Sequence, residues 1–287
     1  MRVRLKHFVI LFFLLFNCRA NELNQGREYM EQGKHIDAIK FFDIILQNDT
    51  LNQAALAYRG YCYEQLGNYD LAINDLEKAV EIDRNDLHSL TNLGDVYYKK
   101  GDFLAAKEVF KKIYIKDKRS KSINYNLGVV YFHEAQYDSA LIFLNKQIDL
   151  YPSDADAYFN KGHLLFLTGQ EEKAMIEINK GLKYNKSAIG YFLLGLISFK
   201  KGDYNQAIRF HTKAISVDAY DKEFYIKRSA AYGMLGNYYS TISDCNKALE
   251  LDTMYYDAYE SRMFAYRLLG MTKEYYADSL KLIELSR

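Results

Sequence analysis

Few side chains in this sequence have the type and spacing that chemistry requires. The sequence contains no G-x-S-x-G, no phosphate-binding glycine loop, no H-E-x-x-H and no C-x-x-C. His133 and His163 could face one surface, but no third ligand accompanies them, so they do not predict a metal site. Cys62 and Cys245 fall in separate segments and are expected to be small buried residues. We therefore expect a non-enzyme with no catalytic residue, no cofactor and no metal.

The composition predicts a packed, mostly helical body. Apolar residues make up 49% of the chain and charged residues 26%, with one proline and no tryptophan. The formal net charge is only +1. Binding to nucleic acid needs a basic face, which so balanced a sequence does not indicate. We expect neither a nucleic-acid partner nor a small-molecule substrate.

The glycines indicate which elements position the remaining side chains. Gly60 and Gly67 stand seven residues apart between two segments of apolar periodicity. A shift of 34 residues reaches Gly94 and Gly101, and the pattern continues along the chain. Two helices that meet at a glycine, at a period of 34, predict an array of helical hairpins. Ala135 replaces the second glycine in one unit, so that helix must end without glycine's conformational freedom.

Large and small residues recur at fixed places in each unit. An aromatic residue of the first helix recurs as Tyr29, Tyr63, Tyr97, Tyr131, Tyr232 and Tyr266. A small residue of the second helix recurs as Ala38, Ala72, Ala106, Ala140, Ala174 and Ala207. With these positions the sequence resembles the tetratricopeptide repeat family over residues 19–287. The resemblance implies an all-α fold, a right-handed superhelical solenoid of about eight helical hairpins.

The expected domain organisation is a leader followed by the solenoid. Residues 1–17 are expected to be a signal peptide, and residues 18–287 the solenoid. The repeats are expected at 19–52, 53–86, 87–120, 121–154, 155–187, 188–221, 222–255 and 256–287. The fifth repeat is one residue shorter than the repeats before it.

The leader indicates export. Basic residues at the start precede an apolar run over residues 8–16, which is too short to span a membrane as a helix. The end of this run resembles a bacterial lipobox, in which Cys18 becomes the lipidated first residue of the mature chain. The resemblance implies a bacterial envelope lipoprotein, exported and anchored to a membrane through the lipid on Cys18. Two alternatives remain: cleavage after Ala20, which gives a secreted or periplasmic soluble protein, or an uncleaved anchor.

The resemblance also implies where a partner binds. In tetratricopeptide arrays the first helix of each unit lines a concave groove. The inward positions here hold the amides Asn92, Asn126 and Asn160, the rings Tyr98, Phe132, Phe166 and Phe199, and the rings Tyr125, Phe159 and Phe192. Amides can grip the backbone of an extended peptide, and an exposed row of rings marks a contact site. The alternative is that these rings pack between helices as core.

These features predict a non-enzymatic protein–protein interaction scaffold at a bacterial membrane surface, with a peptide segment or partner protein bound in the groove. The alternative is an accessory subunit of an envelope enzyme or secretion complex, with catalysis supplied by another chain. A cytosolic co-chaperone with a carboxylate clamp is not indicated. That clamp requires lysine, asparagine and arginine at inward positions, where this chain has Tyr61, Asp95, Val129 and His163.

Overall fold

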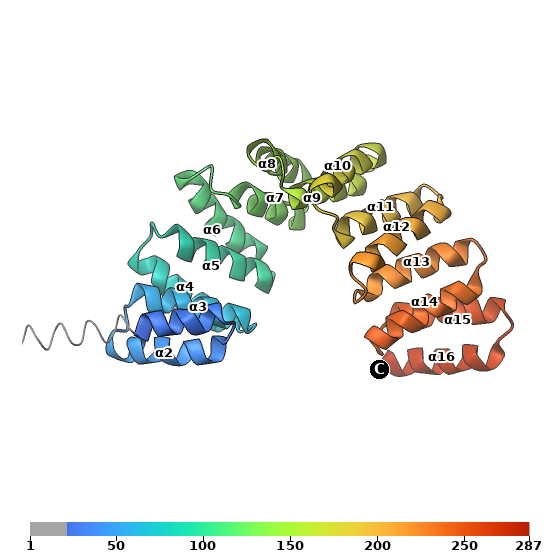
Figure 1. The fold of residues 1–287 in the computed structure, drawn as a ribbon, viewed down its shortest axis with the longest axis horizontal. Helices are drawn as coiled ribbons and strands as arrows, with labels where there is room; N and C mark the ends of the chain where they lie inside the picture. The colour runs from blue at the N-terminus through green and yellow to red at the C-terminus, as the bar shows by residue number, and fades with distance from the viewer. Residues whose placement is uncertain (1–21, 287) are drawn as a thin grey trace, which may run out of the picture. The chain divides into compact units, whose positions relative to one another are not determined.

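The computed structural model describes residues 22–286, whose regular elements are all helices (Figure 1). A first helix covers residues 22–31. The others are α2 (His35–Asn48), α3 (Gln53–Gln65), α4 (Tyr69–Ile82), α5 (Leu87–Lys100), α6 (Phe103–Lys116), α7 (Ile123–His133), α8 (Tyr137–Leu150), α9 (Ala155–Leu167), α10 (Glu171–Tyr184), α11 (Ala188–Lys200), α12 (Tyr204–Val217), α13 (Lys222–Met234), α14 (Tyr238–Leu251), α15 (Tyr256–Leu268) and α16 (Thr272–Leu285). No strand occurs in this described part of the chain, so the predicted all-α repeat fold is confirmed.

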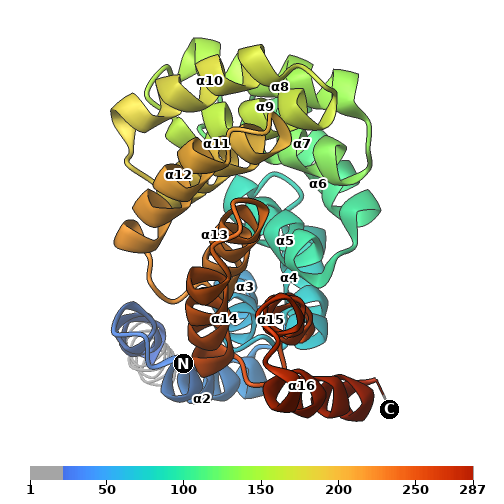
Figure 2. The ribbon, with the colours of Figure 1, turned by 90° about the vertical axis from the view of Figure 1, so that its right-hand side faces the viewer.

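The chain divides into two compact units between Phe143 and Leu144, within α8. In the first unit α3 pairs with α4 and α5 with α6. In the second, α9 pairs with α10, α11 with α12, α13 with α14 and α15 with α16. Both views show these pairs as antiparallel hairpins stacked side by side within their unit (Figures 1 and 2). None of the helices in residues 22–286 has the length and hydropathy that crossing a membrane requires.

Local signals in the sequence start and end these helices. The Asp102 side chain accepts a hydrogen bond from the backbone N–H of Ala105 at 3.0 Å and so caps the start of α6. Gly101 ends α5 in the left-handed region, at φ 85°. Ala135 takes the same region at φ 56°, the one non-glycine residue to do so among those described. The helix before Ala135 therefore ends at the expected place, but with backbone strain.

A second set of glycines lets the two helices of a hairpin approach closely. A Cβ on Gly60 would lie 2.8 Å from Cγ of Leu76, and one on Gly94 would overlap the ring of Phe110. Both large side chains are fully buried. The glycine thus makes the space that the large residue of the second helix fills. In α12 this large residue is His211, whose ring lies against Gly195.

Candidate protein-binding surface

The first helices of neighbouring repeats lie closer together than the second helices do. α3 contacts α5, and α9, α11, α13 and α15 contact one another in order. No comparable contact joins successive second helices among the described elements. Within each unit the first helices therefore line the inner side of the stack. This is the side that the predicted binding residues were expected to face.

In the first unit, the predicted residue Tyr98 belongs to a cluster of rings. Its hydroxyl lies 3.0 Å from Nε2 of His133, and the His133 ring stacks on Phe103 with 4.5 Å between centroids. Phe132 meets the same imidazole edge-on at 5.7 Å. Burial raises the pKa of Tyr98 and lowers that of His133, so both remain neutral near pH 7. The cluster holds Tyr98 and Phe132 half-buried at the inner side, and Tyr125 is half-buried as well.

The three predicted amide residues are half-buried, and each has a partner within the chain. Asn92 Nδ2 lies 3.4 Å from His88 Nε2, Asn126 Nδ2 donates to Asp95 Oδ1 at 3.3 Å, and Asn160 Nδ2 donates to the Asp156 carbonyl at 3.0 Å. The first two amides, in the first unit, bond to side chains. Asn160, in the second unit, bonds to the backbone of its own helix. A peptide must replace these bonds before it can use the amides.

Asp95 gives the inner side of the first unit an unbalanced negative charge. Burial, and then the nearby carboxylate of Glu64, raise the pKa of Asp95 to about 6 against the opposing charge of Lys99. Lys99 does not pair with Asp95 but donates to Glu64 at 2.6 Å. Among the described residues no ion pair reaches Asp95. Two carboxylates therefore share one ammonium group beside the ring cluster.

In the second unit, the first helices carry exposed apolar side chains as well as the predicted rings. Phe166 and Phe199 are half-buried, and Lys200 Nζ lies 5.1 Å from the centroid of the Phe166 ring. The neighbouring inner positions hold Leu167 (50% exposed), Met234 (57%), Phe264 (45%) and Leu268 (46%). We name Phe166, Leu167, Phe199, Met234, Phe264 and Leu268 the apolar strip. Its members lie toward the C-terminal ends of four successive first helices, α9, α11, α13 and α15.

Sequence reasoning missed four members of the apolar strip. It followed the aromatic position of each repeat, which holds Gly233 in α13 and Arg267 in α15. Met234 and Leu268 each stand one residue after that position, as Leu167 does after Phe166. Comparing this next position along the repeats would have found these three residues, but not Phe264, which stands three residues before Arg267.

Two predicted groove residues are corrected, because their rings fill space between helices. Phe159 is 3% exposed, and a Cβ on Gly181 or Gly190 would come within 2.6 Å or 2.7 Å of its ring. Phe192 is partly buried, and its ring packs against the buried Phe224 with 5.1 Å between centroids, at the edge of a core cluster of the second unit. Glycines opposite Phe159 leave room for its ring in the interior. Neither residue is retained in the candidate surface.

No three side chains of metal-ligating type come together in residues 22–286. Cys62 and Cys245 are buried, and burial raises the pKa of each thiol to about 12. Both thiols therefore stay protonated and unreactive. Cys18 and the predicted signal peptide lie outside the described residues.

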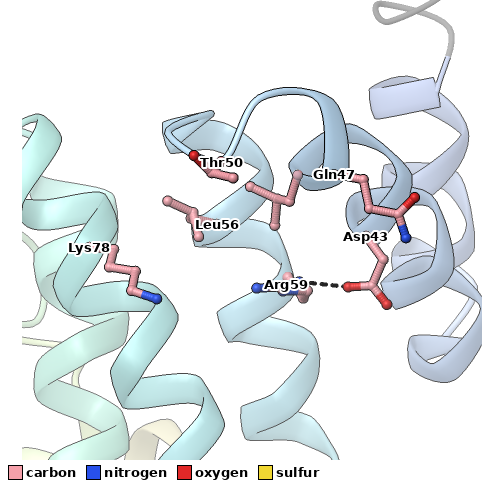
Figure 3. A pocket seen from close by; sticks show the side chains of 7 residues that line it. Asp43, Gln47, Thr50, Leu56, Arg59 and Lys78 are labelled. Carbon is pink, nitrogen blue, oxygen red and sulfur yellow. Dashed lines mark hydrogen bonds and ion pairs between the residues drawn. The ribbon is translucent and has the colours of Figure 1, made fainter.

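A separate polar pocket of about 340 Å³ opens between α2, α3 and α4 of the first unit (Figure 3). Arg59 and Asp43 face each other across it, with Arg59 Nη1 donating to Asp43 Oδ1 at 2.6 Å. Arg59 Nε and Nη2 also donate to the buried Asp75. Three of the five N–H groups of the guanidinium are thus bonded to two carboxylates, whose negative charges disfavour an anionic ligand in this pocket.

The fold and its exposed inner surface together define a class of protein, the helical-hairpin repeat scaffold. Three family models match the chain: a TPR repeat over residues 60–101, a tetratricopeptide repeat over 91–154, and a tetratricopeptide repeat over 155–187 and 188–221. These matches run together from residue 60 to residue 221, more than half of the 287-residue chain. The chain belongs to the tetratricopeptide repeat family. Proteins of this fold are protein–protein interaction scaffolds.

Solved structures show the same fold. A tetratricopeptide repeat protein from Parabacteroides merdae is 23% identical, with a TM-score of 0.61 over 74% of this chain and 84% of that one. The C-terminal part of a TPR repeat-containing protein from Cytophaga hutchinsonii is 18% identical, with a TM-score of 0.59 over 83% and 98%. The APC/C hetero-tetramer Cut9–Hcn1 gives 17% identity and a TM-score of 0.66 over 88% and 50%. No curated protein matches the sequence.

Proposed function

We propose that this protein is a non-enzymatic scaffold that binds a segment of a partner protein along the first helices of its hairpins. The apolar strip of the second unit carries the proposal. Four of its side chains are 45% to 57% exposed and lie on the first helices α9, α13 and α15, while α11, the first helix that follows α9, contributes the half-buried Phe199. Apolar side chains gathered on one surface of a folded protein typically mark a contact site. Large apolar groups at the centre of such a site supply most of the binding energy.

The repeat geometry specifies the chemistry of the bound segment. Packed helices lie about 8–10 Å apart, which is the length of about three residues of extended chain. A partner segment in the polyproline II conformation, whose side chains return to the same side every third residue, therefore matches the apolar strip when every third side chain is apolar. In the first unit, Asp95 and Glu64 favour a basic group in whatever segment reaches them, because Lys99 neutralises only one of the two carboxylates.

We further propose that the protein is exported and held at a membrane by a lipid on Cys18. The basic start, the short apolar run and the cysteine support this proposal, and the first repeat begins directly afterwards. Replacing Cys18 with Ser should move the protein from the membrane fraction to the soluble fraction or leave it unprocessed. A Cys18→Ser variant with an unchanged mature mass that still sediments with membranes would contradict the anchor.

Site-specific photocrosslinking in cells tests the binding surface. A photoreactive amino acid at Met234 of the apolar strip should capture a discrete partner. The matched control is Ile176, which is 55% exposed against 57% for Met234 but lies on the second helix α10. The control should capture nothing, or only what a random surface position captures. Equal products from both positions would show that the apolar strip is not a binding surface.

The captured partner is then tested in purified form. The double change Met234→Asp and Leu268→Asp should weaken its binding at least about tenfold, because charges replace apolar contacts at the centre of the surface. The melting temperature should stay nearly unchanged, since both residues are about half exposed. Unchanged affinity would contradict the proposal. Co-purification with an enzyme would support the accessory-subunit form of the same function.

A further inference from the structure

The outer face of α16 carries a row of exposed apolar side chains. Tyr276 is 61% exposed, Leu280 69% and Ile283 51%, and they recur at four- and three-residue spacing along one side of the helix. We name these three residues the α16 stripe. The opposite side of α16 packs into the unit through Asp278 and Leu282. α16 therefore has one face packed into its unit and a second, apolar face that no described residue covers.

Earlier repeats show what covers such a face. Each second helix is packed by the first helix of the next repeat: α4 by α5, α10 by α11, α12 by α13 and α14 by α15. In α14 the residues equivalent to Tyr276 and Ile283 are Ile242 and Leu249. Leu249 is only 9% exposed, because it lies in a cluster with Ala258 of α15. The α16 stripe thus has the positions of an inter-repeat contact but no described helix against it.

The centre of the α16 stripe departs from the earlier repeats. Leu280 is equivalent to Asn246 of α14, whose Oδ1 accepts a hydrogen bond from Arg262 of the next repeat at 2.5 Å. Leucine cannot accept that bond, so α16 is not suited to receive another repeat of this Arg type. It is suited to an apolar helix.

The N-terminal helix of a second copy, residues 22–31, is not such an apolar helix. Tyr259 and Arg262 are two of the side chains by which α15 contacts the preceding repeat, beside Ala258. The equivalent residues of the first helix, residues 22–31, are Glu22 and Gln25. Burying these polar side chains against the α16 stripe would cost free energy without an apolar gain. Head-to-tail stacking of copies is therefore disfavoured, whereas pairing of two identical apolar faces closes after two copies.

We infer that two copies of this chain associate through α16, antiparallel about a twofold axis near Leu280. Charge complementarity supports this arrangement. Lys273 and Glu284 lie at the two ends of the helix, on the same side as the α16 stripe by helical spacing. Antiparallel pairing brings Lys273 of one copy beside Glu284 of the other, and the twofold axis repeats the pair. A parallel pairing would instead place like charges together.

Sedimentation over a concentration series tests this inference. One 14-residue helix face is at the low end of specific interface sizes, so we expect a dimer with a dissociation constant on the order of 10–100 µM. Leu280→Glu should weaken dimerisation at least about tenfold. The matched control Leu104→Glu, at a leucine that is 66% exposed on α6, should leave it unchanged. A monomer at all concentrations, or equal effects of both changes, would overturn the inference.

Charge exchange and crosslinking test the geometry. Lys273→Glu should weaken the dimer, and the double change Lys273→Glu with Glu284→Lys should restore it. In a Cys18→Ser background, Leu280→Cys should form a disulfide-linked dimer on mild oxidation, since Cys62 and Cys245 are buried. A mass that grows beyond two copies would indicate head-to-tail assembly and overturn the twofold arrangement. The inference is independent of the apolar strip, so either can fail alone.

Discussion

The guanidinium of Arg228 and the carboxylate of Asp244 form a two-pronged ion pair between α13 and α14. Nε donates to Oδ2 at 2.8 Å and Nη2 donates to Oδ1 at 2.7 Å. The same pair, with the same separation of 16 residues, recurs as Arg59–Asp75 and Arg262–Asp278. In the fifth repeat the two positions hold another ion pair, Lys161–Glu177 at 3.4 Å. In the third and fourth repeats they are apolar, as Leu93 with Val109 and Leu127 with Phe143, which share one core cluster. The fold therefore accepts either an ionic or an apolar contact at this place.

This exchange predicts how the ionic repeats respond to mutation. Arg228→Ala should lower the free energy of unfolding by about 3–5 kcal/mol, because it leaves Asp244 buried and unpaired. The double change Arg228→Leu with Asp244→Val copies the apolar repeats and should restore stability to near the original value or above it. Urea unfolding followed by circular dichroism measures both. A double variant as unstable as Arg228→Ala would show that the apolar contact depends on its own repeat.

His211 should make the second unit sensitive to acid. Its side chain is fully buried, and neither ring nitrogen has a hydrogen-bond partner among the described residues. Burial, and then the charge of Arg228, lower its pKa from 6.5 to about 4. Between these pH values His211 is protonated in the unfolded chain but neutral in the folded chain. The free energy of unfolding therefore falls as the pH drops from about 6.5 to 4.

Replacing His211 with Leu, the residue type found at the equivalent Leu76, should remove this dependence of stability on pH. Between pH 7 and pH 4, the free energy of unfolding should fall by roughly 3 kcal/mol less in the variant than in the parent protein. Unfolding midpoints at both pH values give the comparison. His88→Leu, at an exposed histidine, is the control and should follow the parent. Parallel losses in the parent and in His211→Leu would contradict the prediction.

Asp95 should have the opposite effect to His211 on how stability depends on pH. Its pKa is raised to about 6 from 3.8, so the folded state favours the protonated carboxyl. Stability is then highest below pH 3.8 with respect to this group and falls as the pH rises to 6. Asp95→Asn should stabilise the protein by about 1–2 kcal/mol at pH 7, less than the full shift implies because the carboxylate keeps some contact with water. The gain should vanish near pH 4, and a gain that is equal at both pH values would point to packing.

Ala135 stores strain that glycine would release. The left-handed conformation costs a non-glycine residue about 1–2 kcal/mol, which glycine would avoid. Glycine also makes the unfolded chain more flexible, which offsets part of the stability gained. Ala135→Gly should therefore raise the free energy of unfolding by up to about 1 kcal/mol. Gly101→Ala, at the equivalent turn of the preceding repeat, should lower it by a similar amount. Chemical denaturation of both variants measures the pair, and a loss in Ala135→Gly would refute the strain argument.

Truncating a buried aromatic ring should cost more stability than truncating a ring on the binding surface. Phe159→Ala removes a ring that is 3% exposed and should cost about 3–5 kcal/mol of stability. Phe199→Ala should cost clearly less, since its ring is half-buried at the inner side. Thermal melting of both variants checks this order. A larger loss of stability for Phe199→Ala would show that this ring belongs to the core and not to the binding surface.

The sequence predicted the helices well because each repeat carries its own start, stop and packing residues. Gly94 and Phe110 are a case in point, since the absence of a side chain at one predicts the large side chain at the other. The same period predicted less about the binding surface. It identifies the face of a helix, but an inner ring such as Phe159 can turn toward a neighbouring helix wherever that helix leaves space. Only Gly181 and Gly190 together create that space, and they lie in different repeats.

Electrostatic features were the least predictable. Asp95 and Glu64 are separated by one repeat, and their shared dependence on Lys99 follows from the stacking of α3 against α5. The Arg–Asp pairs could have been found, because arginine and aspartate recur in phase in the second, seventh and eighth repeats. The outward side of α16 carries charged residues such as Lys273 and Glu284, and the exposed Leu280 shows that those charges share the face with apolar groups.

The contact of Phe159 with Gly181 and Gly190 limits how this protein can be rebuilt from its parts. Repeat arrays are attractive for engineering because single repeats can often be copied, deleted or exchanged. Here one ring needs a glycine in its own repeat and another in the repeat that follows, and a Cβ at either would come within 2.7 Å of that ring. The interchangeable module is therefore the pair of repeats over residues 155–221. A design that transplants only half of it must also supply the missing void.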